Sequence, residues 1–172
     1  MSRPIPKQKA PELSFNTLEG ELWSLKDQAP QNFTLVVFYR GLHCPICKSY
    51  LQQLEELIPD FREKGVDAVA VSMDSEKRAR LSRQKWDLKK LKLGYGLDQE
   101  AAKSWGLYLS EAIKDEEPDL FSEPGLFLID DSNKVYYVAI NSNPWGRPHL
   151  PSFLKAVDYI NSSGYPARGE HN

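Results

Sequence analysis

The stretch FTLVVFYRGLHCPICKSYLQQLEELIPDF, residues 33–61, decides how the rest of the chain is arranged. Its apolar run 35–39 is short and rich in β-branched and aromatic side chains, which predicts a strand buried on both faces. From Ile46 to Phe61 the apolar residues recur at the spacing of an amphipathic helix. Gly65 is expected to end that helix, and the apolar run 66–71 predicts a second buried strand. The order strand, helix, strand predicts a parallel βαβ unit with a right-handed crossover.

Cys44 and Cys47, the only two cysteines, lie at the start of this predicted helix. Pro45 suits the first helical position because its missing N–H would have no partner there, which places Cys44 at the N-cap. Unpaired backbone N–H groups and the positive end of the helix dipole favour a thiolate at that position. The two sulfurs are close enough to form a disulfide over one helical turn. Cys44 is therefore the candidate nucleophile and Cys47 its candidate partner.

The composition excludes several classes of protein. At 172 residues with 41% hydrophobic residues, the chain is expected to form one domain with a single core. Its net charge of −2 gives no general attraction to nucleic acid or to an acidic membrane, and neither partner is expected. No apolar run approaches the roughly 18 residues of a membrane span. The start, MSRPIPKQKAPEL, lacks the apolar core of a signal peptide, so the sequence predicts a cytoplasmic protein.

The remaining sequence divides into a domain at 10–161, a flexible N-terminal arm at 1–9 and a disordered tail at 162–172. Outside the βαβ unit, the predicted elements are a hairpin at 13–25, helices at 75–86, 99–105 and 150–160, and strands at 91–97, 125–130 and 134–140.

Two segments carry most of the charge. The helix at 75–86 and the lysines that follow it are basic, and we interpret them as a solvated helix face because no glycine-rich or aromatic pattern accompanies them. Residues 111–123 are acidic and are expected to form an exposed loop or short helix that answers the basic helix electrostatically.

Four short motifs carry a resemblance to a known family. They are APEL with LEG and WSL within residues 10–25, FYRGLHCPIC at 38–47, VAVSMD at 69–74 and EPGLFLID at 123–130. Through them the chain resembles the peroxiredoxin-like (AhpC/TSA, redoxin) branch of the thioredoxin-fold proteins over nearly the whole domain. The resemblance implies an α/β, thioredoxin-like fold with a central mixed sheet flanked by helices and an N-terminal β-hairpin. It also implies an antioxidant oxidoreductase in which Pro124 is a cis-proline beside the active-site sulfur.

The sequence departs from both parent patterns. Peroxiredoxins proper carry a proline and a threonine or serine seven and three residues before the attacking cysteine, but this chain has Val37 and Gly41 there. Thioredoxins proper usually carry a buried aspartate in the central strand, whereas residues 36–39 contain no carboxylate. Neither parent activity is therefore expected to transfer unchanged.

Each candidate site residue has a simpler interpretation. The CxxC motif could be half of a zinc site, but zinc needs four ligands and only His43, His149 and His171 are available to complete the set. The cysteines could also be incidental structural residues. His43 either stabilises a thiolate as imidazolium or simply fills the turn, and we favour the second interpretation. Arg40 either favours a thiolate or an anionic substrate, or is a solvated strand-end residue.

The sequence therefore predicts a thiol–disulfide oxidoreductase in which Cys44 attacks and Cys47 resolves, supported by Arg40, His43, Pro45 and Pro124. No metal or organic cofactor is expected, and electrons would come from a thiol reductant such as the thioredoxin or glutathione system. The alternatives are a thiol-dependent peroxidase and a non-catalytic redox sensor or adaptor. Disulfide exchange ranks above peroxide reduction because Gly41 lacks the hydroxyl that would hold a peroxide.

Overall fold

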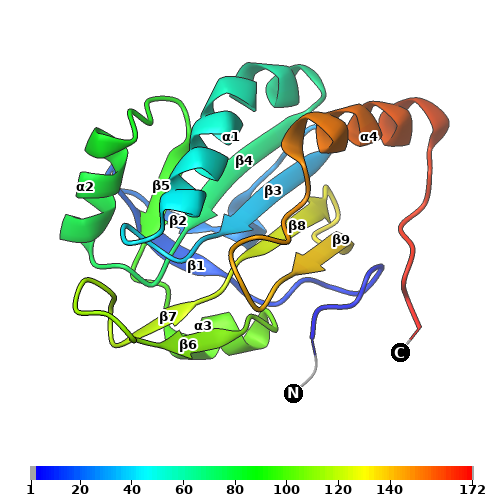
Figure 1. The fold of residues 1–172 in the computed structure, drawn as a ribbon. Coiled ribbons are helices and arrows are strands. Elements are labelled where there is room, and N and C mark those ends of the chain that lie inside the picture. The colour runs from blue at the N-terminus through cyan, green and yellow to red at the C-terminus, as the bar shows by residue number, and fades with distance from the viewer. Residues whose placement is uncertain (1–2, 172) are drawn as a thin grey trace.

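The βαβ unit predicted from residues 33–71 is the centre of the fold in the computed structural model, which describes residues 3–171 (Figure 1). Strand β3 (Phe33–Phe38) leads through a loop into helix α1 (Pro45–Glu63), and strand β4 (Val66–Val71) follows. β3 and β4 pair in parallel, from Phe33 with Val66 to Phe38 with Val71. Gly65, with a φ of 73°, lies between α1 and β4. The parallel strands that the sequence predicts are confirmed.

The other elements follow the predicted order with one addition. They are β1 (Ser14–Thr17), β2 (Leu22–Ser24), the 3-10 turn η1 (Leu25–Asp27), α2 (Glu76–Lys85), β5 (Lys92–Tyr95), α3 (Gln99–Ser104), β6 (Leu109–Glu111), β7 (Leu120–Ser122), β8 (Gly125–Asp130), β9 (Val135–Ile140) and α4 (Leu150–Ser163).

The main sheet has seven strands in the order β2-β1-β5-β4-β3-β8-β9. The β3–β4 and β4–β5 pairs are parallel, and the other pairs are antiparallel, so the sheet is mixed as predicted. Phe38 at the end of β3 pairs with Gly125, which in turn pairs with Ile140 at the end of β9. β3 and β9 therefore end at the same edge of the sheet. Two loops leave from that edge: the cysteine loop, residues 39–44, and the arginine loop, residues 141–149.

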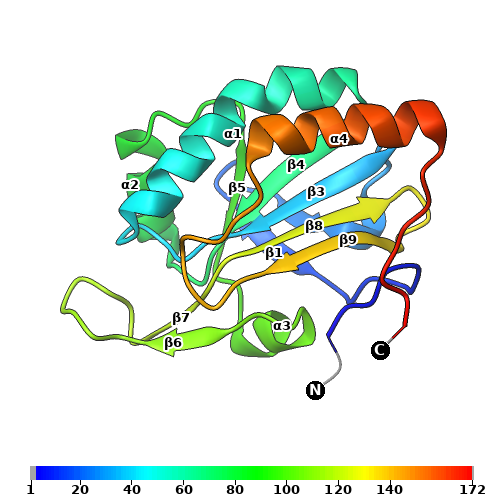
Figure 2. The same ribbon diagram turned by 45° about the vertical axis from the view of Figure 1, so that its right-hand side comes forward.

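Alternate residues of β3 face two different cores, which is why its apolar run is continuous. Leu35 and Val37 belong to a cluster that includes side chains from α1, α2 and α4. Val36 and Phe38 belong to a second cluster that includes Trp105, at the end of α3. Figure 2 shows α1 and α4 on one side of the sheet and α3 on the other. The sheet is thus flanked by helices on both faces.

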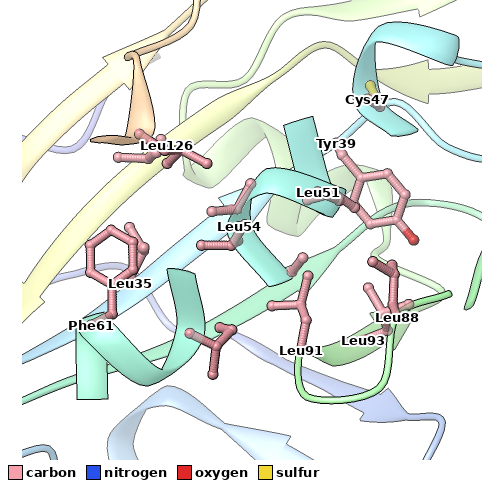
Figure 3. Packing of buried hydrophobic residues seen from close by; sticks show 14 of the residues in the cluster. Leu35, Tyr39, Cys47, Leu51, Leu54, Phe61, Leu88, Leu91, Leu93 and Leu126 are labelled. Carbon is pink, nitrogen blue, oxygen red and sulfur yellow. The ribbon is translucent and has the colours of Figure 1, made fainter. Parts of the chain in front are cut away.

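Helix α1 keeps one apolar face buried in the core along its length. Leu51, Leu54, Ile58 and Phe61 are buried on that face, and Figure 3 shows Leu51, Leu54 and Phe61 among the other buried side chains of the cluster. The exposed face is polar. Among the helices of residues 3–171, none is long and apolar enough to cross a membrane.

The acidic segment contains two short strands that the sequence analysis missed. β6 and β7 pair antiparallel, from Leu109 with Ser122 to Glu111 with Leu120, and only the residues between them form an exposed loop. Phe121 is 1% exposed and anchors the hairpin. The contact with the basic helix is made by Arg78, whose Nη2 donates to the backbone oxygen of Glu116 at 3.3 Å. The loop therefore meets α2 through its backbone at this point.

The N-terminal arm is not free as predicted. The Lys7 N–H donates to the Val135 oxygen at 2.8 Å, and the Val135 N–H donates to the Gln8 oxygen at 2.9 Å. β9 is an edge strand, and its unpaired backbone groups explain why an extended arm binds there. Residues 7–9 of the predicted arm thus lie along β9, while residues 1 and 2 lie outside the described part of the chain.

The C-terminal segment also departs from the disordered tail predicted for 162–172. Helix α4 continues to Ser163, and Gly164, with a φ of 66°, ends it in the left-handed conformation. The chain then descends beside β9 towards the N-terminal arm (Figure 2). The Tyr136 hydroxyl donates to the Tyr165 oxygen at 2.6 Å, and Glu170 forms an ion pair with Lys7. These two contacts account for the defined path, and residue 172 lies outside the described part.

Candidate active site

The cysteine loop ends at Cys44, which is the N-cap of α1. Cys44 has an extended backbone with φ −104° and ψ 103°, and Pro45 takes the first helical position. The Cys47 N–H donates to the Cys44 Sγ at 3.1 Å. The Cys44 N–H donates to the Gly41 oxygen at 3.1 Å. The position predicted from Pro45 is confirmed, and the Cys44 sulfur lies at the positive end of the helix.

The two thiols have opposite acidities although both are free and buried. A hydrogen bond from the Cys47 side chain is the main reason that the pKa of Cys44 falls from 9.0 to about 6, and it outweighs the effect of burial. The Cys47 N–H, Arg40 and Arg147 lower that pKa further. Burial raises the pKa of Cys47, and its hydrogen bond to Cys44 raises it again. At neutral pH this arrangement favours a thiolate at Cys44 and a thiol at Cys47.

The structure adds an arginine that the sequence analysis did not single out. Arg147, in the arginine loop, donates from Nη2 to the Cys47 Sγ at 3.0 Å, and the same atom lies 4.0 Å from the Cys44 Sγ. Its Nε donates to the Pro144 oxygen at 3.0 Å, and its guanidinium carbon lies 4.9 Å from the centre of the Tyr50 ring. One guanidinium group thus contacts both sulfurs and can stabilise negative charge on either of them.

The directions of the strands could have predicted that Arg147 lies near the cysteines. The predicted strand 134–140 returns as a hairpin from strand 125–130, and the loop after it reaches the sheet edge where β3 also ends. The sequence Asn-Pro-Trp-Gly-Arg-Pro at 143–148 holds one charged side chain. Placing that loop beside Cys44 required the antiparallel pairing of β3 with β8, and the residue pattern alone did not specify which strand lies next to β3.

Arg40 is held by a buried carboxylate. Its Nε lies 3.0 Å from the Glu123 Oε2, and Glu123 is 3% exposed. The Ser110 hydroxyl donates to the Glu123 Oε1 at 2.8 Å, and the Arg40 guanidinium carbon lies 4.9 Å from the centre of the Phe121 ring. Burial works to lower the pKa of Arg40, but Glu123 and a hydrogen bond to Cys44 raise it overall. Arg40 is therefore a fixed cation beside the thiolate, and the solvated alternative is wrong.

His43 acts as a packing residue, in agreement with the interpretation favoured from the sequence. Its ring meets the Phe121 ring edge-on with 4.6 Å between centroids, and both ring nitrogens are buried without a hydrogen-bond partner in the described part of the chain. Burial lowers the pKa of His43, and the nearby Arg40 lowers it further. Both effects favour the neutral form of the ring over the imidazolium.

Asp74, in the turn after β4, clamps the cysteine loop. Its carboxylate is fully buried, the Oδ2 accepts from the Leu42 N–H at 2.8 Å, and the Oδ1 accepts from the Arg78 Nε at 2.9 Å. Gly41 has a φ of 135°, and a Cβ added there would lie 2.7 Å from the Asp74 Oδ2. The backbone conformation and the carboxylate thus both exclude a side chain where peroxiredoxins proper carry their hydroxyl.

Pro124 differs from the expectation that the resemblance implied. Residues 3–171 contain no cis peptide bond, so the peptide before Pro124 is trans. Trans is the lower-energy form of the peptide bond, and two backbone hydrogen bonds flank Pro124 in this form. The Glu123 N–H donates to the Tyr108 oxygen at 2.8 Å, and the Asn141 N–H donates to the Pro124 oxygen at 3.1 Å. Pro124 lies next to the Phe38–Gly125 pair, at the edge of the sheet that carries Cys44.

The surroundings of the thiols bear on the zinc alternative. Within residues 3–171, no group of three or more His, Cys, Asp or Glu residues is placed to hold an ion. The His43 ring packs on Phe121, and the His149 Nδ1 lies 2.8 Å from the Ser152 hydroxyl. The donor set at the thiols is therefore two sulfurs and two arginines, which suits an anion better than a cation.

Comparison with known proteins gives the family. The AhpC/TSA family model matches residues 6–138. The chain belongs to the AhpC/TSA family. The alkyl hydroperoxide reductase C of Helicobacter pylori is 27% identical over 159 residues, which cover 90% of this chain and 77% of that protein. AhpC/TSA membership makes this chain an oxidoreductase of the peroxiredoxin-like group, with a thiol-dependent redox function.

Solved structures support the fold. The peroxidoxin BcpB from Mycobacterium tuberculosis superposes with a TM-score of 0.74 at 16% identity, covering 92% of this chain and 99% of that one. A peroxiredoxin-like protein from Aquifex aeolicus superposes with a TM-score of 0.75 at 17% identity, covering 93% and 90%. The thioredoxin-like fold implied by the sequence motifs is confirmed. In this fold Cys44 and Cys47 lie where the residue pattern placed them, at the N-terminus of α1.

Proposed function

We propose that this AhpC/TSA protein is a thiol–disulfide oxidoreductase that cycles through a disulfide between Cys44 and Cys47. The opposite acidities of the two neighbouring thiols carry the proposal. The lowered pKa of Cys44 supplies a nucleophile at neutral pH, and the raised pKa of Cys47 keeps the second sulfur protonated until it is needed. Arg147 contacts both sulfurs and therefore supports both stages.

The cycle with a disulfide substrate has two steps. The Cys44 thiolate attacks one sulfur of the substrate, the substrate S–S bond breaks, and the other sulfur leaves as a thiolate. Cys47 then loses its proton and attacks the Cys44 sulfur, which releases the second substrate thiolate and forms Cys44–Cys47. The substrate gains two electrons and the enzyme loses two. A thiol reductant returns the enzyme to the dithiol form.

A peroxide is the second candidate oxidant, and the burial of the nucleophile favours it. Cys44 is 1% exposed, so a small molecule reaches it more readily than a bulky disulfide does. The Cys44 thiolate would attack one peroxide oxygen and become a sulfenic acid, while the O–O bond breaks and the other oxygen leaves as water or an alcohol. Cys47 would then displace water from the sulfenic acid to give the same disulfide. The absence of a hydroxyl at Gly41 should make peroxide reduction slow, because one oriented hydrogen-bond donor is worth roughly 2.7–4 kcal/mol, or about 100- to 1000-fold in rate. Disulfide exchange needs no such donor, so it keeps the first rank.

The electron donor that we propose is a cytoplasmic thiol system of the thioredoxin or glutathione type, because a thiol can reduce the Cys44–Cys47 disulfide by the same exchange chemistry. A non-catalytic redox sensor or adaptor would use the same disulfide as a switch. Rapid steady-state turnover with a reductant favours the enzyme, whereas a changed set of bound proteins on oxidation, without turnover, favours the sensor.

Stopped-flow oxidation of the reduced protein tests the proposal, with hydrogen peroxide and a small disulfide compared side by side. Cys44→Ser is expected to abolish both reactions. Cys47→Ser is expected to react once with a disulfide and to accumulate a mixed disulfide, which also serves as a trap for the natural substrate. Peroxide consumption much faster than disulfide exchange would reverse our ranking and assign a peroxidase. Oxidation of Cys44→Ser at the wild-type rate would remove Cys44 from the mechanism altogether.

A further inference from the structure

A cavity of about 980 Å³ lies away from the thiols, between α4, β9, the N-terminal arm and the C-terminal tail. Figure 2 shows these four segments on the side of the sheet that carries β9. Its volume is at the upper end of the range for small-molecule sites, which is about 300–1,000 Å³. The cavity borders the arginine loop at Pro148 and His149, and the Pro148 oxygen accepts from the Tyr50 hydroxyl at 2.6 Å.

The walls of this cavity are mainly apolar and aromatic. Leu128 and Tyr137 form its floor on the sheet, while Phe153 and Ile160 contribute from α4. The Tyr137 and Phe153 rings pack together with 5.1 Å between centroids. A cavity of this size with such walls favours a ligand whose body is a hydrocarbon chain, because burying each CH₂ group is worth about 0.8 kcal/mol and so raises affinity severalfold.

The charges on the cavity wall have one sign. Arg3 and Arg168 line it, and no carboxylate does so among residues 3–171. In that part of the chain neither arginine forms an ion pair, and Arg168 only donates to the Tyr165 hydroxyl at 3.2 Å. The nearby Glu170 is paired with Lys7. Two cations beside an apolar cavity provide charge complementarity for an anionic ligand.

We infer that this cavity is a binding site for an anionic amphiphile with a long hydrocarbon chain, such as a fatty-acid carboxylate. The chain of the ligand would lie between α4 and β9, and its carboxylate would lie against the arginines of the lining, Arg3 or Arg168. The two cysteines are not part of this site, because neither of them lines it.

Calorimetric titration of the reduced full-length protein with laurate tests this site. Laurate is expected to bind with one molecule per chain, and dodecyltrimethylammonium, which has the same chain length and the opposite charge, is expected to bind at least about tenfold more weakly. Ala156→Trp fills the cavity from α4 and should weaken laurate binding about tenfold or more. Lys155→Trp, on the same helix but outside the lining, should leave it unchanged.

A second variant keeps the test decisive if Ala156→Trp fails to fold. Arg3→Gln with Arg168→Gln changes only the rim, and it should weaken laurate binding about tenfold without changing dodecyltrimethylammonium binding. The inference is overturned if laurate gives no saturable binding, or if the cationic amphiphile binds equally well. It is also overturned if Ala156→Trp instead breaks an oligomer seen by size-exclusion chromatography in the wild type, since a second copy would then occupy the cavity.

Discussion

The cysteine loop and the arginine loop leave the same edge of the sheet, but they are held by different forces. The cysteine loop is fixed by buried charge: Asp74 binds the Leu42 N–H, and Glu123 pairs with Arg40. The arginine loop contacts the thiols through Arg147, which is held by a backbone oxygen and an aromatic ring. Buried charges leave large penalties when one partner is removed, whereas neutral contacts leave small ones.

The two loops therefore have different roles in the site. The cysteine loop must present Cys44 at the start of α1 in one conformation, and its buried ion pairs specify that conformation. The arginine loop supplies a cation that has to serve two sulfurs in turn, and weaker contacts permit it to shift between them. Changes around the cysteine loop should therefore reduce stability together with activity, while changes in the arginine loop should alter reactivity with little effect on stability.

The largest effect is expected for Asp74→Ala. The change leaves the Leu42 N–H without its acceptor and Arg78 without its ion-pair partner, and the free energy of unfolding should fall by about 3 kcal/mol. Urea unfolding measures this loss. Asp98→Ala is the matched control, because that carboxylate caps α3 at the exposed surface and its removal should cost about 1 kcal/mol. Equal losses in the two variants would show that Asp74 is an ordinary cap.

The next effect concerns Gly41→Ala. Its φ of 135° and the 2.7 Å approach of Asp74 predict a loss of about 1–3 kcal/mol, whereas Gly96→Ala, with a φ of 67° and open space around it, should lose only about 1 kcal/mol. A double-mutant cycle separates the two causes. If the carboxylate is the obstacle, Gly41→Ala will be less harmful in an Asp74→Ala background. Additive losses in the cycle would attribute the whole effect to backbone strain.

The sequence predicted the cysteine loop better than the arginine loop for a physical reason. The strand, the N-cap and the helix around Cys44 are local in sequence, so periodicity and Pro45 specify them. The contact between Arg147 and the sulfurs joins residues about a hundred positions apart, and it depends on how β3, β8 and β9 pair. The contact between Asp74 and the cysteine loop is equally non-local. In the sequence it was visible only as a glycine at position 41, where peroxiredoxins proper carry a hydroxyl side chain.

The same reasoning explains the contacts of the N-terminal arm and the missed β6–β7 hairpin. The prolines and the polar composition of residues 1–9 indicated a flexible arm. In the structure residues 7–9 lie along the edge strand β9, and that edge exists only once the sheet has assembled. The β6–β7 hairpin was missed because each strand has three residues, too few to show an alternating pattern.

A smaller, purely chemical effect is expected for Arg147→Gln. The alkylation rate of Cys44 in the wild type should rise with pH through a midpoint near its pKa of about 6, because the thiolate is the reactive form. Without the cation the thiolate is less favoured, so the midpoint should move up by about one unit, with the free energy of unfolding changed by about 1 kcal/mol or less.

Two controls sharpen the test of Arg147. Arg147→Lys keeps the charge but loses the planar group that reaches both sulfurs, so it should restore part of the midpoint shift and slow the closure of the Cys44–Cys47 disulfide. Arg83→Gln, which removes a cation paired with Glu19 away from the thiols, should leave the midpoint where it is. A large loss of stability in Arg147→Gln would contradict the contrast between the two loops.

The smallest effect is expected for His43→Phe, although His43 lies directly beside the nucleophile. The His43 ring is held by its edge-on contact with Phe121, and both of its nitrogens are buried without partners in the described residues. Phenylalanine preserves the ring packing and removes two unsatisfied polar atoms, so the free energy of unfolding should stay level or rise slightly. Because burial lowers the pKa of His43, the neutral ring contributes no charge at pH 7, and the alkylation midpoint of Cys44 should shift by less than about half a unit. A shift as large as that of Arg147→Gln would mean that an imidazolium stabilises the thiolate, and the cysteine loop would then supply a titrating charge in addition to its fixed ones.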